Sequence, residues 1–345
     1  NRRGDCMANV TIKDVAREAE VSVSTASKAL SGKGSLKPDT VKKIKDTAKR
    51  LGYMPNKFAS ALPRKKLKIG VLMACNPIEV AYYNEKGIRD GFAMESEFGA
   101  EYLIEKYDLY TKENYKNKLK KLAEECDGII AFGIEDDETA QLIGKKPAIA
   151  LHSGIHKKNI SNVSIDAFTV GRLAAQFLSI CGSKKTAVIA GEKGASLHTE
   201  NINGFSAGTK EYKMSIEKIS YCNNKIETAY EKTMKILKKY PDVTGIFTTS
   251  YVAPGICNAL KDMKKDKKVA VVGLDLYKET KESLNDGSLN AVIFQNQALM
   301  TKTAVTAIFD MLSGKPVKNH LIRPELVLKS NLMNYEELLT DNYKF

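Results

Sequence analysis

From Leu67 onward, short uninterrupted apolar runs alternate with longer amphipathic stretches. The runs hold four to six residues, which is typical of parallel strands buried on both faces. The stretches between them carry apolar side chains at helical spacing, as in Asn84–Glu97, Phe168–Ile180 and Gln297–Leu312. This alternation predicts a doubly wound α/β region. The expected strands are Lys68–Met73, Gly128–Phe132, Ala148–Leu151, Thr186–Ala190, Gly245–Thr248 and Val269–Gly273.

The pattern in front of this region is purely helical. Ser22 can cap a second helix only about three residues after the first helix ends, as a helix-turn-helix requires. Thr11, with Asp14 three residues on, can cap the first helix. Pro38 suits the first turn of a third helix and Gly52 its end. The apolar stripes that predict the helices are Ile12, Val15, Ala16 and Ala19, then Ala26, Ala29 and Leu30, then Val41, Ile44, Ala48 and Leu51.

Positive charge is concentrated at the front of the chain. Residues 1–68 contain 17 Lys and Arg against 6 Asp and Glu, a net charge of +11. The rest of the chain has a net charge of only +2. A small domain with this density of positive charge is expected to neutralise phosphates, so we predict that it binds nucleic acid.

The second expected helix carries side chains suited to a DNA groove. Ser24, Thr25 and Ser27 lie opposite its core residues, are short enough to let the helix enter the major groove, and can bond phosphates or base edges. Lys28 can reach further. The alternative is a plain helical bundle with a solvated serine face. The charge excess and the short turn together argue against that alternative.

Other classes of protein are excluded by what the sequence lacks. No apolar run approaches the roughly 20 residues of a membrane span, and none resembles a signal peptide, so we expect a cytoplasmic protein without membrane contact. The six cysteines are scattered and are expected to be reduced. The four histidines show no metal spacing, and there is no P-loop, G-x-S-x-G or G-x-G-x-x-G. We therefore predict no enzyme activity, no cofactor and no metal site.

One continuous stretch resembles a known family. The run T-I-K-D-V-A-R-E-A-E-V-S-V-S-T-A-S-K-A-L, followed by L-G-Y-M-P-N, resembles the DNA-binding headpiece of the lactose-repressor (LacI/GalR) family. Two residues depart from it: Lys37 replaces a Ser or Thr cap, and Glu20 replaces a turn Gly, where a positive φ would cost ~1 kcal/mol. The resemblance implies that DNA is contacted by Thr11, Ser22, Val23, Ser24, Thr25, Ser27, Lys28, Ser31 and Tyr53.

The segment Asn56–Leu62 is similar to the hinge helix of that family. The resemblance implies that two such helices, one per subunit, pair in the minor groove, with Leu62 wedged between the central base pairs. Asn56, Lys57 and Ala59 would contact DNA beside it. A helix of about seven residues is too short to be stable alone, so it would form only with DNA and its partner. An ordinary linker with a buried Leu is the alternative.

The order of elements after Leu67 resembles the type I periplasmic-binding-protein fold, the effector domain of the same family. This implies two α/β lobes, three crossovers and a ligand cleft. Ser164–Asp166, Gly204-Phe205, Val272–Asp275 and Asn290–Asn296 carry the resemblance. The residues that it places in the cleft, or near it, are Tyr82, Tyr83, Asn201, Ser250, Asp275 and Gln295.

The expected cleft differs from the family pattern in ways that predict a neutral ligand. Asn201 stands where an Arg often grips a sugar or acid, and Thr249-Ser250 replaces an Asn-Asp pair. A carboxylate with amides and hydroxyls suits a hydroxyl-rich ligand, on which Tyr82 and Tyr83 could stack. A helix-capping role is the alternative for Asp275.

The expected fold is therefore α plus α/β: a three-helix helix-turn-helix headpiece with a hinge helix, then a two-lobed periplasmic-binding-protein-like domain. We expect a homodimeric regulator, a repressor, that binds double-stranded operator DNA under control of a small-molecule effector, a sugar. We reject the alternative of a solute-binding protein for transport, because the sequence shows no signal peptide. A DNA-binding regulator or architectural protein with a degenerate, ligand-free α/β domain stays open.

The expected domain boundaries follow from these patterns. Asn1–Cys6 look foreign, because Arg2-Arg3 can be encoded by a ribosome-binding sequence just before Met7, which we expect to be the true start. At 345 residues the chain is also too long for one core. We expect a leader at 1–9, the headpiece at 10–55, the hinge and linker at 56–66, the effector-binding and dimerisation domain at 67–333 and a tail at 334–345.

Overall fold

The computed structural model divides the chain into two compact units. The first holds residues up to Leu67, and the second holds Lys68–Glu95 and everything from Ala100 onward. Among the described residues, no helix is long and apolar enough to cross a bilayer. The structure describes residues 12–31, 36–51, 66–96, 99–109, 111–155 and 157–335.

The first unit is a small helical bundle whose described helices are α1 (Ile12–Glu18), α2 (Val23–Ser31) and α3 (Pro38–Leu51). The predicted apolar stripes meet in one core, with Ile44 at its centre fully buried. Ser22 caps α2, because its Oγ accepts a hydrogen bond of 3.1 Å from the backbone N–H of Thr25. The helix-turn-helix prediction is therefore confirmed in its helices, core and second cap.

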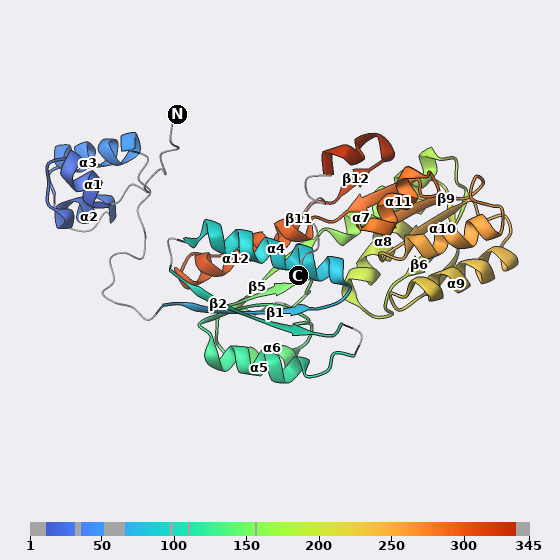
Figure 1. The fold of residues 1–345 in the computed structure, drawn as a ribbon, viewed down its shortest axis with the longest axis horizontal. Coiled ribbons are helices and arrows are strands. Elements are labelled where there is room, and N and C mark those ends of the chain that lie inside the picture. The colour runs from blue at the N-terminus through green and yellow to red at the C-terminus, as the bar shows by residue number, and fades with distance from the viewer. Residues whose placement is uncertain are drawn as a thin grey trace, which may run out of the picture. The chain divides into compact units, whose positions relative to one another are not determined.

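The second unit is built on two six-stranded sheets in the described chain, one in each lobe (Figure 1). The strand order is β11-β5-β4-β3-β1-β2 in the first lobe and β12-β10-β9-β8-β6-β7 in the second. Among the strands of the described residues, only β12 runs antiparallel to its neighbour. The strands of the first lobe are β1 (Lys68–Ala74), β2 (Glu101–Tyr107), β3 (Gly128–Phe132), β4 (Ala148–Leu151), β5 (Ile160–Ile165) and β11 (His320–Ile322). Those of the second are β6 (Lys185–Ala190), β7 (Ser215–Tyr221), β8 (Gly245–Thr248), β9 (Ala270–Leu274), β10 (Ala291–Phe294) and β12 (Glu325–Val327).

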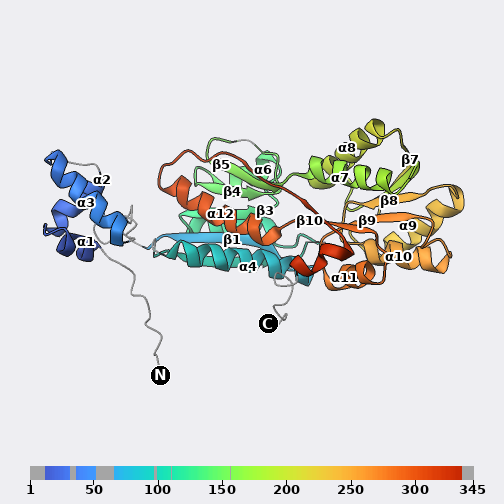
Figure 2. The same ribbon diagram turned by 90° about the horizontal axis from the view of Figure 1, so that it is seen from above.

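Helices cover both faces of each sheet, so the central strands are buried on both sides. In the first lobe α4 and α12 lie on one face and α5 and α6 on the other (Figure 1). In the second lobe α7 and α8 lie opposite α9, α10 and α11 (Figure 2). These helices are α4 (Ile78–Met94), α5 (Tyr115–Glu125), α6 (Asp137–Ile143), α7 (Ala167–Ile180), α8 (Ser196–Glu211), α9 (Ile226–Lys239), α10 (Ala253–Asp262), α11 (Lys278–Asn285) and α12 (Gln297–Leu312).

The chain passes between the lobes three times, as expected. It leaves the first lobe after β5, returns after β10 through α12, and leaves again between β11 and β12. Asp166 marks the first crossing, where its Oδ1 accepts a 3.0 Å hydrogen bond from the N–H of Thr169 and caps α7. Asn296 caps α12 in the same way at the second crossing.

The predicted strands are all present within a residue or two, but other elements differ from expectation. Helix α4 begins at Ile78 rather than Asn84. Its first residues include exposed Ile78 and half-buried Val80, and the buried positions of the helix begin only at Ala81. Strands β2 and β7 were missed because they are sheet edges without a continuous buried run, and β5 because it buries the polar Ser161 and Asn162.

Candidate functional site

The exposed face of α2 is the first candidate site. Ala26 and Ala29 are buried in the core, whereas Ser24 and Lys28 are exposed and Val23 is 43% exposed. Exposed Ser22 shares hydrogen bonds with the Ser24 and Thr25 hydroxyls, and Thr25 and Ser27 are half-buried. Helix α2 therefore presents small hydroxyl side chains and one lysine, a surface that fits a DNA groove.

Glu20 in the turn before α2 has the left-handed backbone expected from its replacement of glycine, with φ of 56°. Its carboxylate pairs with Lys43 on α3 at 3.1 Å, but both groups are largely exposed. An exposed ion pair contributes little to stability. The strain at this position is therefore only partly offset.

Other predicted DNA contacts lie outside the described residues. The hinge helix and its wedge belong to this group, and so does the side chain of Ser31, although its backbone ends α2. These positions are Thr11, Tyr53, Asn56, Lys57, Ala59 and Leu62.

The second candidate site is a cleft of about 810 Å³ in the second unit, with walls from both lobes. This volume lies within the roughly 300–1,000 Å³ of small-molecule sites. Three of the residues predicted to contact an effector, Ser250, Asp275 and Gln295, line this cleft. The first lobe also contributes Asn84, Tyr107, Tyr115, Phe132 and His152, and the second contributes His198, Asn224, Thr249 and Tyr251.

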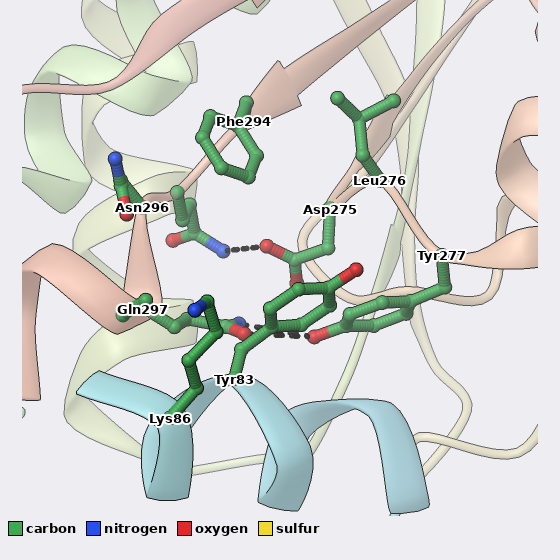
Figure 3. Close-up of a pocket in the computed structure, with 10 residues that line it drawn as sticks. Tyr83, Lys86, Asp275, Leu276, Tyr277, Phe294, Asn296 and Gln297 are labelled. Atoms are coloured by element: carbon green, nitrogen blue, oxygen red, sulfur yellow. Dashed lines mark hydrogen bonds between the residues drawn. The ribbon is translucent and has the colours of Figure 1, made fainter. Parts of the chain in front are cut away.

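Asp275 is the carboxylate at the inner end of the cleft. It follows β9 with a φ of 63°, a conformation costly for a non-glycine residue and common where a side chain must be aimed at a site. Its Oδ1 accepts a 3.1 Å hydrogen bond from Gln295 Nε2 (Figure 3). Burial raises the pKa of the carboxyl group to about 7, against the lowering effect of its hydrogen bonds from Gln295 and Tyr277. The N-cap of the next helix is Tyr277, so Asp275 is not a helix cap.

Polar atoms on both walls of the cleft are buried without a hydrogen-bond partner among the described residues. They are Asn84 Oδ1 and His152 Nδ1 in the first lobe and Gln295 Oε1 in the second. Burial lowers the pKa of His152 to about 4, with a further lowering by His198, so its ring is neutral at pH 7. A buried unpaired polar atom costs about 1–3 kcal/mol, which a ligand hydrogen bond would remove.

His198, on α8, lines the cleft, and the sequence analysis gave it no role. Its Nδ1 lies 2.8 Å from the Thr249 carbonyl oxygen, which can only accept, so Nδ1 carries the proton. Burial lowers the pKa of His198, and the neutral ring has Nε2 as an acceptor. A Cβ at Gly191 would lie 2.3 Å from Nε2, so glycine makes room for this ring.

Three predicted cleft residues lie elsewhere than expected. Asn201 is fully buried in α8, with neither side-chain amide atom paired among the described residues, and it is not in the cleft wall. Tyr82 is half-buried and also absent from that wall. Tyr83 lies behind Asp275, where its ring stacks on Tyr277 with centroids 6.3 Å apart and 15° between the planes (Figure 3).

The cleft contains aromatic side chains that sequence reasoning missed. Tyr107 and Tyr115 pack edge to face at 5.0 Å, and the Tyr115 hydroxyl donates to the Phe132 carbonyl oxygen at 2.8 Å. Phe132 lies at the carboxyl end of a predicted strand, which is where ligands of open α/β sheets bind, and that rule could have found it. Tyr107 ends an edge strand and Tyr115 begins a helix, so no comparable signal marked them.

Two family patterns match this chain. Residues 11–56 match the bacterial regulatory proteins of the lacI family, and residues 93–316 match the periplasmic binding protein domain. The order of the two matches is the order of the two units. The chain belongs to the LacI family of transcription regulators. This LacI-family protein is a DNA-binding regulator, and its homologues are transcription regulators and not enzymes.

Curated relatives of this LacI-family protein are regulators. Catabolite control protein A of Priestia megaterium is 29% identical over 287 residues, covering 77% of this chain and 82% of that protein. The HTH-type transcriptional regulator MalR of Streptococcus pneumoniae is 26% identical over 289 residues, covering 77% and 83%.

Solved structures confirm the fold of the second unit of this regulator. GanP, a glucose-galactose binding protein from Geobacillus stearothermophilus, has a TM-score of 0.72 at 23% identity, covering 78% of this chain and 99% of that one. A periplasmic solute binding protein from Actinobacillus succinogenes with bound D-allose has a TM-score of 0.70 at 20% identity, covering 78% and 100%. The described residues contain no group of three or more His, Cys, Asp or Glu placed to hold a metal ion.

Proposed function

We propose that this regulator is a cytoplasmic repressor whose operator affinity is controlled by a neutral, hydroxyl-rich ligand, a sugar, bound in the cleft. The observation that carries the proposal is the set of buried acceptor atoms on both walls. Asn84 Oδ1, Gln295 Oε1 and the Asp275 carboxylate all require hydrogen-bond donors. A ligand with several hydroxyl groups supplies such donors to both lobes at once.

The charges of the cleft favour a neutral ligand over an anion. The lysines that line it, Lys112, Lys116 and Lys193, are exposed, and Lys116 is paired with Glu138 at 2.5 Å. Among the described residues that line the cleft, Asp275 is the carboxylic acid whose side chain is buried. An anionic ligand would lie against that carboxyl in a low dielectric, where like-charge repulsion is strong.

The ligand would act by favouring one arrangement of the two lobes. A homodimer would place two copies of α2 in successive major grooves of a pseudo-palindromic operator. Any change in the spacing of the two headpieces would then alter operator affinity, because both must fit at once. A ligand shifts this equilibrium only if it binds one arrangement more tightly than the other.

A ligand screen coupled to DNA binding tests the proposal. The operator is first recovered by sequencing DNA selected by the purified full-length protein. Thermal shift is then measured with D-glucose, D-galactose, D-allose and D-arabinose, and with D-gluconate and D-glucose 6-phosphate as anionic controls. We expect a neutral sugar to raise Tm and to change operator affinity. If none does so, the second unit is a ligand-free dimerisation module.

A further inference from the structure

Behind the ligand-facing wall of the cleft, aromatic residues of the two lobes meet. Tyr277 follows β9 in the second lobe, and Tyr83 projects from α4 in the first. Their rings are nearly parallel, and both side chains are buried, at 5% and 8% exposure. The edge of Tyr251, which lines the cleft, packs against Tyr277 at 6.0 Å. Tyr277 is therefore enclosed by one ring from each lobe.

Two side-chain hydrogen bonds join the segments that follow β9 and β10, and we call them the inner rung and the outer rung. The inner rung links Gln295 Nε2 to Asp275 Oδ1 at 3.1 Å. The outer rung, two residues further on each strand end, links Gln297 to Tyr277, with Gln297 Nε2 donating to the hydroxyl at 3.0 Å. Dashed lines in Figure 3 mark both rungs. Asp275, Gln295 and Gln297 line the cleft, and the outer rung ties Tyr277 to Gln297, the first residue of α12.

Helix α12 belongs to the first lobe because it packs on α4 without space between the two backbones. A Cβ at Gly87 would lie 2.1 Å from the carbonyl oxygen of Ala298, so the two backbones are in direct contact. One turn away, Thr301 Oγ1 donates to the Asn84 carbonyl oxygen at 3.0 Å. Gln297 and Tyr83 thus belong to one rigid body, and Tyr277 is the second-lobe residue that contacts both.

We propose that Tyr277, Gln297 and Tyr83 form an inter-lobe latch. The latch positions Asp275 and transmits to the first lobe whether a ligand is bound at Asp275. A ligand that bonds Asp275 competes with Gln295 for the carboxylate. The strand ends then shift, the outer rung and the ring stack shift with them, and α4 follows. Tyr277 and Gln297 are positioning residues in this scheme. The latch rests on the proposed function only for its response to ligand.

Tyr277→Phe tests the latch without a ligand, since it keeps the ring and removes the hydroxyl, with its hydrogen bonds to Gln297 and Asp275. The matched control is Tyr230→Phe, which removes a 2.8 Å hydrogen bond to Asp262 within the second lobe. Spin labels at Lys120→Cys on α5 and Lys235→Cys on α9, both exposed sites, report the distance between the lobes. The full-length background has Cys6, Cys75 and Cys181 replaced by serine.

We expect Tyr277→Phe to raise the population with separated lobes about fivefold, the effect of losing one average hydrogen bond. Gln297→Leu, which removes the outer rung alone, should change the population in the same direction. The double variant should match Tyr277→Phe, because Gln297 has no Tyr277 hydroxyl to bond once that hydroxyl is removed. Tyr230→Phe should leave the distances unchanged. Distance distributions of Tyr277→Phe and wild type that superimpose would overturn the latch, as would an equal change in Tyr230→Phe.

Titration with the same sugars separates the latch from the proposed function. Tyr277→Phe should bind a sugar within about twofold of wild type and lose most of the sugar-dependent change in operator affinity. A full response in the variant would overturn the latch. If no sugar binds wild type, the ligand proposal fails, while the ligand-free distances still decide the latch.

Discussion

The headpiece and the cleft bind by opposite physical means. The headpiece offers the exposed face of one helix within a strongly cationic segment of the chain, whereas the cleft offers buried acceptors from both lobes around a carboxyl group. Charge acting through water is long-ranged and screened by salt. Hydrogen bonds in a buried site are short-ranged, and the loss of a single donor or acceptor atom changes the binding free energy. The headpiece should therefore respond mainly to ionic strength, and the cleft to pH and single-atom changes.

The largest expected effect is the loss of operator binding when the headpiece is removed. A chain lacking residues 1–66 should show no specific binding in fluorescence anisotropy while its circular dichroism keeps an α/β signature. In the full-length protein, log K should fall with log salt at a slope near −0.9 per phosphate contact. Specific binding by the truncated chain would place the DNA site outside the headpiece.

Asp275→Asn should stabilise the protein at pH 8. Burial raises the folded-state pKa of Asp275 to about 7, above its ordinary value of 3.8, so ionisation opposes folding. The wild-type stability tied to this group is full below pH 3.8 and is lost as pH rises through about 7. Asparagine keeps the side-chain shape and tolerates the left-handed backbone. Denaturant unfolding at pH 8 should show a gain of roughly 2–4 kcal/mol that disappears near pH 4.

Lys28→Ala should weaken operator binding by ~1–3 kcal/mol if Lys28 contacts a guanine. Val23 and Ser24 lead the same helix, and exchanging them should change the preferred half-site. DNA selection with the Val23→Ser, Ser24→Val double variant provides the measurement. An unchanged consensus would mean that another element contacts the bases.

Ligand affinity should fall below about pH 7, the pKa of Asp275. A hydroxyl group donates to the carboxylate better than to the protonated acid, so binding favours the ionised form. Affinity for a neutral sugar should drop about tenfold per pH unit on the acid side and level off above pH 7. Calorimetry at pH 6 and pH 8 would show this, with Asp275→Asn giving a flat profile. A flat wild-type profile would remove Asp275 from the contact.

The smallest effect is expected at the turn of the headpiece. Glu20→Gly removes the strain of a φ of 56° and should stabilise the headpiece by ~1 kcal/mol, less the exposed pair with Lys43. Amide exchange of α1 and α3 in the intact protein would report it. Glu20→Gln serves as a control because it keeps the strain while removing the charge.

How far each site could be predicted from sequence follows from how it is assembled. The face of α2 is formed by consecutive residues, so helical spacing alone separated buried Ala26 and Ala29 from exposed Ser24 and Lys28. Strands with continuous apolar runs were equally clear. Edge strand β2 and polar strand β5 were not, because burial there comes from neighbours distant in sequence.

The cleft was predicted at its strand ends and missed between them. Asp275 and Gln295 follow buried strands, where the rule for open α/β sheets applies. His152 and Tyr115 come from loops and helix starts whose direction depends on the packing of a whole lobe. Asn201 was assigned by resemblance alone, and its burial within α8 is not encoded in any local pattern.

The short segment from His320 to Val327 has a consequence for the order in which the protein is made. It supplies the edge strand β11 to the first lobe and the edge strand β12 to the second. Both sheets therefore stay incomplete on the ribosome until residues 320–327 have been made, long after α3 of the headpiece has been made. The described helices of the headpiece can therefore fold on a nascent chain before either sheet of the second unit is complete.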